Sequence, residues 1–349
     1  MKEKVLLGMS GGVDSSVSAI LLKQMGYEVI GCTMVLLENE NTYKQLKDAK
    51  SICEKLNIPH YTFQYKEIFN CKVINNFISQ YKEAKTPNPC VECNKYLKFG
   101  VFFDKAKELG CKYIATGHYA RIEESSKYNQ KVIKKSKEEK KDQTYFLYGI
   151  KREVLNHIIF PLQDYESKDL VRKIASKYNL EVATKKDSQE ICFIENNDYK
   201  TFLKKEANIK QKKGNIILAK TREILGTHDG FINYTIGQRK GLGIAYKNPL
   251  YVIGLNKEKN EVIVGKEEEL YSKTLTANML NWLVFEGLKE PIKCYAKIRN
   301  RAIEAKAIVY PYEDYVKVEF SEPQRAITKG QSVVFYDEDK ILLGGGIIM

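Results

Sequence analysis

The sequence predicts an α/β protein in which a parallel-sheet domain precedes one small and one larger all-β module. The first third of the chain alternates strand-length apolar runs with helical periods, whereas short β-rich runs separated by Gly or Asn follow after about Lys204. The length of 349 residues fits two or three domains. With 43% apolar and 29% charged residues, the composition is that of a folded globular protein.

The elements of the first third follow from their periodicity. Residues 4–9 are an apolar run of strand length, and residues 14–25 repeat apolar side chains at helical spacing until Gly26 ends the helix. The same alternation predicts strands at 27–36, 60–65 and 111–116, and helices at 42–56 and 94–109. Residues 86–94 hold two prolines and are expected to form a loop.

The second half of the sequence predicts two all-β modules. Short strands are expected at residues 215–219, 250–255, 261–264, 305–309, 315–320 and 332–336. Many short strands with frequent turn residues are typical of small barrels and sandwiches.

The chain is basic, and its excess charge is unevenly distributed. Lys and Arg number 57 against 44 Asp and Glu, a net charge of +13, but the residues from Leu275 onward hold ten of each sign. Residues 127–141 carry seven Lys and two Glu, and residues 203–213 carry five Lys and one Glu. Such runs are either solvated loops or surfaces for a polyanion such as a nucleic acid.

The cysteines and the apolar runs bear on the compartment. Eight Cys are spread along the chain, unlike the dense frameworks of small secreted proteins, so reduced thiols are expected. No run approaches the roughly 20 apolar residues of a membrane span. The first residues lack the pattern of a signal peptide. We therefore expect a cytoplasmic protein with no membrane partner.

A glycine-rich turn follows the first predicted strand. Residues 10–16 read SGGVDSS, and at the start of a helix such a turn can bind phosphate through backbone N–H groups. Ser10 and Ser15 add hydroxyl donors, and Asp14 can hold Mg²⁺ on the phosphates. The turn lacks the GxxxxGK[ST] pattern and resembles the PP-loop of the ATP pyrophosphatases, which cleave ATP between the α and β phosphates. The alternative is a tight turn without a ligand.

Two places in the sequence are candidates for sulfur chemistry. Cys90 and Cys93 lie three residues apart at the start of a predicted helix, where the helix N-terminus lowers thiol pKa values. Cys192 follows Lys185 and Lys186, which favour a thiolate, although a Cys within the apolar run ICFI is more often a core residue. The chain has one CxxC pair, which disfavours structural zinc.

Six motifs in a fixed order carry a family resemblance. They are SGGVDSS (10–16), TPNPCVECNKYLKFG (86–100), TGHYAR (116–121), KDQTYFLY (141–148), DSQEICFI (187–194) and YTIGQRKGLG (234–243). Together they resemble the bacterial tRNA-specific 2-thiouridylases of the MnmA type, from residue 4 nearly to the C-terminus. Argininosuccinate synthetase and GMP synthetase, two other PP-loop enzymes, share only the first motif.

The resemblance implies a reaction with its cofactors and partners. The family thiolates C2 of the wobble uridine, U34, in tRNAs for Lys, Glu and Gln, and uses ATP with Mg²⁺ to adenylate the uridine O2. A persulfide on Cys192, loaded by a cysteine desulfurase or a sulfur carrier, then delivers sulfur, with Cys93 as the partner nucleophile. The implied by-products are AMP and pyrophosphate, and Cys93 and Cys192 are expected to form a transient disulfide bond.

The resemblance also implies binding residues and domain boundaries. The implied ATP contacts are Gly8, Met9, Ser10, Gly11, Gly12, Val13, Asp14, Ser15, Met34 and Gly117. Asn88, Pro89 and Cys90 match the loop around the target base, and the implied tRNA contacts are His118, Lys141, Asp142, Gln143, Arg299, Asn300 and Gln331. The implied domains are a PP-loop domain over 1–205, a small central β-rich domain over 206–274 and a C-terminal β-barrel over 275–349.

One residue departs from a common form of the family, in which Asp stands at the place of Cys90 and does acid–base work. A second form also has Cys there, and Cys90, Cys93 and Cys192 would then hold three irons of a [4Fe–4S] cluster. Persulfide transfer and cluster-dependent sulfuration therefore both stay open. Outside this enzyme class, the alternatives are an RNA-binding protein with a vestigial PP-loop and a PP-loop ligase that acts on a small metabolite.

Overall fold

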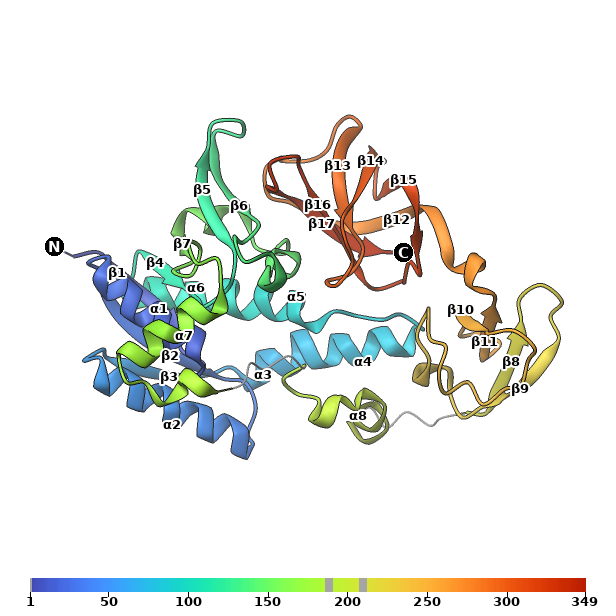
Figure 1. Ribbon diagram of the computed structural model, residues 1–349, viewed down its shortest axis with the longest axis horizontal. Coiled ribbons are helices and arrows are strands. Elements are labelled where there is room, and N and C mark those ends of the chain that lie inside the picture. The colour runs from blue at the N-terminus through green and yellow to red at the C-terminus, as the bar shows by residue number, and fades with distance from the viewer. Residues whose placement is uncertain (1, 186–190, 207–211) are drawn as a thin grey trace.

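A five-stranded parallel sheet organises the N-terminal part of the chain (Figure 1). In the computed structural model, which describes residues 2–185, 191–206 and 212–349, the strand order is β3-β2-β1-β4-β7. The strands are β1 (Lys4–Gly8), β2 (Glu28–Val35), β3 (His60–Gln64), β4 (Tyr113–Ala115) and β7 (Ile158–Ile159). All neighbouring pairs are parallel, which confirms the predicted class.

Helices cover both faces of this sheet because alternate side chains of a strand point to opposite sides. Val5 and Leu7 of β1 pack in one core with the helices α1 (Val13–Gln24), α2 (Glu40–Lys55) and α7 (Lys168–Lys177). Leu6 packs in the other core with Phe99 and α6 (Phe102–Glu108). The helices predicted at 14–25, 42–56 and 94–109 are all present, the last as a π-helical segment (Asn94–Val101) that continues into α6.

The expected loop over residues 86–94 is wrong in its second half, where α5 (Pro89–Cys93) forms. Pro89 lies in the first turn of this helix, where a missing N–H does no harm because that N–H has no intrahelical partner. The helices that precede this region are α3 (Lys66–Phe69), a π-helical segment (Asn70–Ile74) and α4 (Asn75–Lys82).

Two separate β-structures follow, as predicted. A four-stranded sheet of order β10-β11-β8-β9 consists of β8 (Gly214–Leu218), β9 (Ile224–His228), β10 (Tyr251–Asn256) and β11 (Glu261–Gly265). A closed barrel of order β12-β15-β14-β13-β16-β17 consists of β12 (Tyr271–Trp282), β13 (Ile292–Lys297), β14 (Ala305–Pro311), β15 (Val316–Arg325), β16 (Ser332–Tyr336) and β17 (Leu342–Ile348). The strands β9, β12, β13 and β17 were not predicted from the sequence.

The lysine-rich run at 127–141 packs against the barrel instead of forming a solvated loop. It begins in the turn of a hairpin made of β5 (Arg121–Ser125) and β6 (Gln130–Lys134). The Lys127 Nζ lies 3.0 Å from the Asp337 Oδ2, and Lys135 pairs with Glu304. Part of the charge of this run is therefore neutralised within the chain. The second run begins in α8 (Tyr199–Glu206), and its residues 207–211 lie outside the described part.

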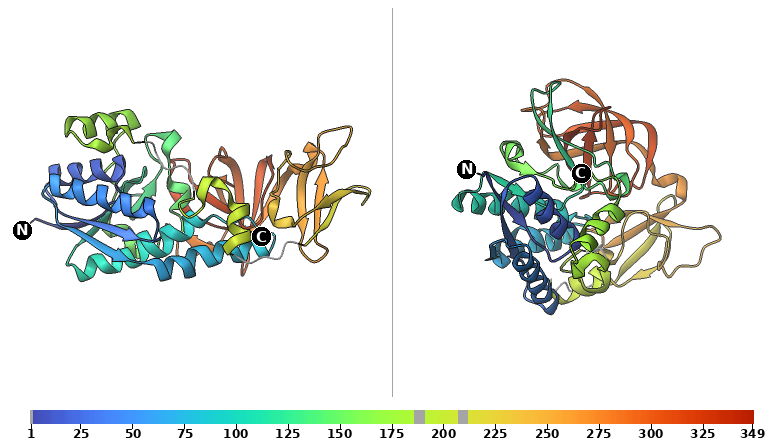
Figure 2. Two further views of the ribbon diagram at one scale, coloured as in Figure 1. Left: turned by 90° about the horizontal axis from the view of Figure 1, so that it is seen from below. Right: turned by 60° about the vertical axis from the view of Figure 1, so that its left-hand side comes forward.

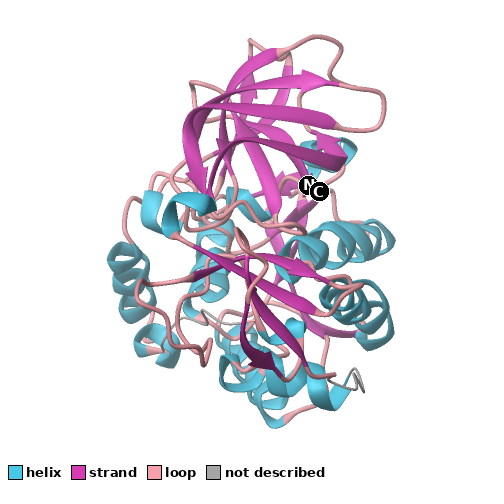
Figure 3. Cartoon of the chain, turned by 90° about the vertical axis from the view of Figure 1, so that its right-hand side faces the viewer, coloured by secondary structure: helices cyan, strands magenta, loops and turns pink. Residues whose placement is uncertain are grey.

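The three parts are arranged along the long axis of the molecule, with the four-stranded sheet at the end opposite the parallel sheet (Figures 1 and 2). Figure 3 shows the strands of the barrel in the upper part of the view and most of the helices below them. One-turn and two-turn 3₁₀ helices lie at Glu139–Lys141, Thr144–Phe146, Arg152–His157, Glu181–Thr184, Glu195–Asn197, Phe231–Asn233 and Glu267–Leu270. Within the described residues, no helix has the length and apolar character needed to cross a membrane.

Candidate active site

The phosphate turn lies where the strand order of the parallel sheet reverses, between β1 and β4. In open α/β sheets, ligands bind in the crevice at the carboxyl ends of the strands at such a point. The turn follows β1, and Gly117 follows β4. A Cβ added to Gly117 would lie 3.0 Å from the carbonyl carbon of Asp14 and the nitrogen of Ser15. Two segments that are distant in the sequence and were predicted to contact ATP therefore lie together.

The backbone of the turn is suited to an anion. Gly11 has a φ of +66°, and a Cβ there would lie 2.5 Å from the Gln45 carbonyl oxygen, so this position requires glycine. The Ser15 hydroxyl accepts the Ser10 N–H at 3.2 Å. Gly12 is the N-cap of α1 and has no side chain to satisfy the first N–H groups of the helix. Those groups stay available to a phosphate.

Three of the implied ATP contacts have side chains that serve the core. Met9 and Val13 are buried between α1 and the sheet, so only their backbone groups are available to a nucleotide. Met34 is half-buried and packs against the opposite core. Direct ATP contact by these residues stays a prediction.

A lysine that has no motif around it, Lys168, lies at this turn. Lys168 is the first residue of α7, and its Nζ lies 2.6 Å and 2.5 Å from the two carboxylate oxygens of Asp14. The Tyr119 hydroxyl donates to the Asp14 Oδ1 at 2.9 Å. Asp14, which was predicted to hold Mg²⁺, is thus already held by two groups. The local sequence around Lys168 shows a helix start at Ser167 and gives no sign of this partner.

The predicted target-base loop is docked on the barrel. The Thr86 N–H donates to the Lys329 carbonyl at 2.8 Å, and the Gln331 Nε2 donates to the Thr86 carbonyl at 2.8 Å. A Cβ added to Gly330 would lie 2.8 Å from the Lys85 Cβ, so the close approach needs glycine here. Asn88 is the N-cap of α5. The barrel therefore positions the start of the helix that carries Cys90 and Cys93.

Three thiols from two parts of the chain meet beside α5. Cys90 and Cys93 lie on α5, and the thiols of both raise the pKa of Cys192. Phe193 and Ile194 pack in one core with Cys93, whereas Cys90 and Cys192 reach the surface. The interpretation of ICFI as core is therefore correct for the residues after Cys192 and wrong for Cys192 itself.

The expectation that these thiols have lowered pKa values is wrong. The pKa of Cys192 is raised to about 12, first by partial burial and then by the neighbouring Cys93 and Cys90 thiols. Burial also raises the pKa of Cys90 and of Cys93. Burial is the largest cause of all three shifts. The Lys98 ammonium acts in the opposite direction and lowers the pKa of all three thiols.

Lys185 does not supply the positive charge that was expected near Cys192. The Lys185 Nζ lies 3.0 Å from the Gly11 carbonyl oxygen and 2.9 Å from the Asp48 carboxylate, so it serves the phosphate turn. Lys186 lies outside the described residues, as do the first four residues of the DSQEICFI motif. The effect of Lys98 on the thiols was not predicted from the sequence. Lys98 lies five residues after Cys93, and in an α-helix residues five apart point in different directions. In the π-helical segment, residues five apart approach each other along the helix axis.

The three thiols do not form a metal-binding set. Among the residues that the structure describes, no group of three His, Cys, Asp or Glu side chains is placed to hold a metal ion. The [4Fe–4S] alternative stays a prediction. All eight cysteines are free, so the structure holds no disulfide between Cys93 and Cys192.

We predict that Lys98→Met slows the alkylation of Cys192 by iodoacetamide. The thiolate is the reacting form, so the wild-type rate should rise with pH across the whole range in which the fold persists, because the pKa is about 12. Removal of the Lys98 charge raises this pKa further and lowers the rate at each pH. Peptide mass spectrometry measures the rates, with exposed Cys71 as internal reference. Lys95→Met is the matched control, since the Lys95 Nζ lies over the Tyr96 ring, 5.0 Å from its centroid; equal rates in all three proteins would contradict the assignment.

Several predicted tRNA contacts have internal partners. His118 is 7% exposed, its Nδ1 lies 2.7 Å from the Thr116 hydroxyl, and burial, followed by Lys98, lowers its pKa well below the ordinary value. It is therefore neutral at physiological pH. The Asp142 carboxylate accepts the Ser136 N–H at 3.0 Å, and the Gln143 Oε1 accepts the Tyr119 N–H at 2.9 Å. These three residues shape the site from within, and their contact with tRNA stays a prediction.

Arg299 is likewise engaged within the barrel. One of its guanidinium nitrogens donates to the carbonyl oxygens of Arg325 and Ala326, and burial lowers its pKa. Asn300 is half-exposed beside it, and Lys141 is also half-exposed. Their contact with tRNA stays a prediction.

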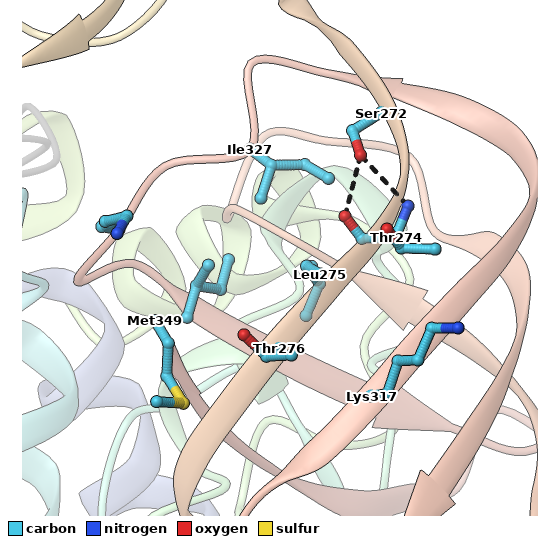
Figure 4. A pocket seen from close by; sticks show the side chains of 9 residues that line it. Ser272, Thr274, Leu275, Thr276, Lys317, Ile327 and Met349 are labelled. Carbon is cyan, nitrogen blue, oxygen red and sulfur yellow. Dashed lines mark hydrogen bonds between the residues drawn. The ribbon is translucent and has the colours of Figure 1, made fainter.

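A groove of about 410 Å³ opens on the barrel next to the docked loop (Figure 4). Five polar residues line it, together with four apolar ones: Ser272, Thr274, Thr276, Lys317 and Lys329, and Leu275, Ile327, Ile348 and Met349. Lys329 is the residue whose carbonyl accepts the Thr86 N–H. The Ser272 hydroxyl donates to the Thr274 carbonyl oxygen at 2.9 Å, so the two lysines are the charged groups of the groove beside this loop.

Comparison with known proteins agrees with this architecture. Family models match in succession: a "tRNA methyl transferase HUP domain" over residues 3–196, a "tRNA methyl transferase PRC-barrel domain" over 200–266 and an "Aminomethyltransferase beta-barrel domain" over 272–348. The tRNA-specific 2-thiouridylase MnmA of Clostridioides difficile (strain 630) is 47% identical over 358 residues, which cover 100% of this chain and 98% of that protein. The enzyme of the same name from Clostridium acetobutylicum is 49% identical over 360 residues and is covered fully, as is this chain. The resemblance carried by the six motifs is confirmed, and the chain belongs to the family of the tRNA-specific 2-thiouridylases.

Proposed function

We propose that this protein uses ATP to replace the O2 of the wobble uridine, U34, of tRNA by sulfur. The observation that carries the proposal is the meeting of Cys192 with Cys90 and Cys93 beside α5, in a chain whose close relatives are named tRNA-specific 2-thiouridylases. A glycine-rich turn suited to phosphate lies in the same domain, at the carboxyl end of β1.

The first step is adenylation of the base. The uridine O2 attacks the α phosphorus of ATP, and pyrophosphate leaves with the bridging oxygen and its electron pair. Mg²⁺ neutralises phosphate charge when bound with ATP. The N–H groups at the start of α1 and the Ser10 and Ser15 hydroxyls bind the phosphates. The product carries AMP as a leaving group on C2, whereas the oxygen of unmodified uridine is a poor leaving group.

The second step is sulfur transfer. The terminal sulfur of a persulfide on Cys192 attacks C2, AMP leaves with the former O2, and the uridine is joined to Cys192 through a sulfur–sulfur bond. The Cys93 thiolate then attacks the Sγ of Cys192, which forms a Cys93–Cys192 disulfide and releases the 2-thiouridine with the electron pair of the broken bond. A dithiol reductant returns both cysteines to thiols, and a cysteine desulfurase or sulfur carrier reloads Cys192.

The high thiol pKa values suit this route. A raised pKa keeps Cys93 protonated and unreactive until a substrate changes its surroundings, and Lys98 supplies the positive charge that a thiolate needs. Cys90 is exposed and stands at the place where an Asp does acid–base work in other members. The persulfide route needs Cys93 and Cys192 alone.

The barrel is the proposed guide for the tRNA. It holds the loop of Thr86 and Pro87 through Gln331, and its groove offers Lys317 and Lys329 to a phosphate backbone. The wobble base leaves a single-stranded loop at low cost, so it can be presented to the cysteines of α5. The tRNAs for Lys, Glu and Gln are the substrates that the family resemblance implies. The lysines of residues 127–141 contribute less to tRNA binding, because several of them are already paired within the chain.

The family models carry the words methyl transferase and aminomethyltransferase, but the site favours sulfur over a methyl group. Three neighbouring thiols in a domain that also holds a phosphate turn have an evident use in ATP-driven thiolation. A persulfide needs a nucleophilic cysteine and a second thiol to release its product.

Reconstitution tests the proposal. The purified protein is incubated with ATP, Mg²⁺, a cysteine desulfurase with cysteine, a dithiol and tRNA that lacks 2-thiouridine. We expect AMP and 2-thiouridine in equal amounts, both dependent on the tRNA. AMP formed without RNA would indicate a metabolite ligase, and tRNA binding with neither product would indicate a vestigial PP-loop.

A further inference from the structure

Lys168 is a buried cation beside the phosphate turn. It is 9% exposed, although lysine is rarely buried without a partner of opposite charge. Its Nζ contacts both oxygens of the Asp14 carboxylate, at 2.6 Å and 2.5 Å. Because Asp14 belongs to the SGGVDSS turn, the ammonium lies at the site where the phosphates of a nucleotide are expected.

Three separate segments build this arrangement. Asp14 comes from the start of α1, Tyr119 from the segment after β4, and Lys168 from the first turn of α7. The Tyr119 hydroxyl donates to Asp14 at 2.9 Å, and the Lys168 Nζ lies 5.7 Å from the centroid of the Tyr119 ring. Gly117 makes the approach possible, since a side chain there would contact the backbone of Asp14. The ion pair is thus held from both strands that border the crevice.

We propose that Lys168 is a phosphate-binding residue of the adenylation site and that Asp14 holds it in place until a nucleotide enters. The β and γ phosphates carry more negative charge than one carboxylate, so they compete for the ammonium. The Mg²⁺ that accompanies ATP prefers carboxylate oxygens and competes for Asp14. Both members of the ion pair therefore exchange partners. The inference rests on the proposed use of ATP and deepens it by naming the cation.

The chemical role follows from the bond that breaks. When the α phosphorus separates from the bridging oxygen, that oxygen takes the electron pair and pyrophosphate gains negative charge. An ammonium that binds the β and γ phosphates stabilises this charge as it develops. Lys168 thereby contacts the leaving group and does not need to contact AMP.

Equilibrium binding of two ligands without tRNA tests the inference. The ligands are α,β-methylene ATP, whose α–β bridge cannot be cleaved, and AMP, which lacks the β and γ phosphates. We expect Lys168→Met to weaken the binding of the ATP analogue by roughly tenfold to a hundredfold and to leave the affinity for AMP unchanged. Isothermal titration calorimetry measures both affinities. Lys173→Met is the matched control, because this exposed lysine lies on the same helix, and neither affinity should change.

Asp14 variants test the exchange. Without Mg²⁺, Asp14→Asn should bind the ATP analogue at least as tightly as the wild type, since no carboxylate then competes for Lys168. The double variant Asp14→Asn with Lys168→Met removes both charges of the ion pair. It should again bind the analogue weakly and bind AMP as the wild type does.

Two outcomes would overturn the inference. The first is that Lys168→Met binds both ligands as the wild type does, or loses affinity for both in equal proportion. The second is that Asp14→Asn binds the analogue more weakly than the wild type without Mg²⁺. The proposed function is tested separately. If Lys168→Met weakens the binding of the analogue and not of AMP, but the protein makes no 2-thiouridine, thiolation is contradicted and the role of Lys168 stands.

Discussion

Replacing Cys192 with serine should reduce the formation of 2-thiouridine to the level seen without the enzyme. A hydroxyl cannot carry the terminal sulfur of a persulfide, so the second step has no sulfur donor. ATP and tRNA should still bind, because Cys192 belongs neither to the phosphate turn nor to the loop docked on the barrel. Nucleoside mass spectrometry measures the product, and filter binding measures the tRNA.

The control for this variant is Cys71→Ser, an exposed cysteine that does not affect the ionisation of Cys192. It should keep full activity. The wild-type protein loaded by a desulfurase should carry its extra sulfur on Cys192 when its peptides are mapped by mass spectrometry. Extra sulfur found solely on Cys93 would reverse the roles assigned to the two cysteines.

Replacing Cys93 with serine should stop the reaction one step later. The persulfide on Cys192 can still attack the adenylated base, but no thiol is then in place to release the product. We expect the tRNA to accumulate as a covalent adduct with Cys192, visible as a band shift in a denaturing gel without reductant. AMP should appear once per adduct and then stop.

Reductant distinguishes this trap from a simple loss of activity. Dithiothreitol should cleave the sulfur–sulfur bond and release tRNA that contains 2-thiouridine. Cys90→Ser is the matched control on the same helix, and it should form product without accumulating the adduct, because the persulfide route does not use Cys90. An inactive Cys93→Ser protein with neither adduct nor AMP would remove Cys93 from the sulfur-transfer step.

The sequence predicts those parts of the fold that have a local signal. The parallel sheet and its helices were assigned because apolar side chains repeat at strand or helix spacing, as in residues 4–9 and 42–56. β17 was missed because its sequence LLGGGII is rich in glycine, and these glycines let the strand approach β12 and Tyr148 closely. β12 was missed because its polar residues hide the alternation. Their pairing is set by closure of the barrel, which involves partners distant in the chain.

The candidate site divides in the same way. The phosphate turn and the cysteines were found because whole motifs mark them, whereas Lys168 was missed because its partner, Asp14, is 154 positions away in the sequence. The direction of the thiol pKa shifts was predicted wrongly because burial among α4, α5 and the segment after Cys192 is a property of the folded chain. The contact of Gln331 with Thr86 has no local signal for the same reason.

The fate of the uridine O2 tests the account most directly. A tRNA transcript with oxygen-18 at O2 of U34 is incubated with the protein, ATP, Mg²⁺ and a persulfide source. Mass spectrometry then measures the oxygen-18 content of the AMP. Adenylation of O2 followed by attack of sulfur at C2 predicts that the heavy oxygen is found in AMP, in an amount equal to the 2-thiouridine formed. Formation of 2-thiouridine with AMP that contains no heavy oxygen would contradict the account, because the oxygen would then have left by a route that does not pass through the adenylate.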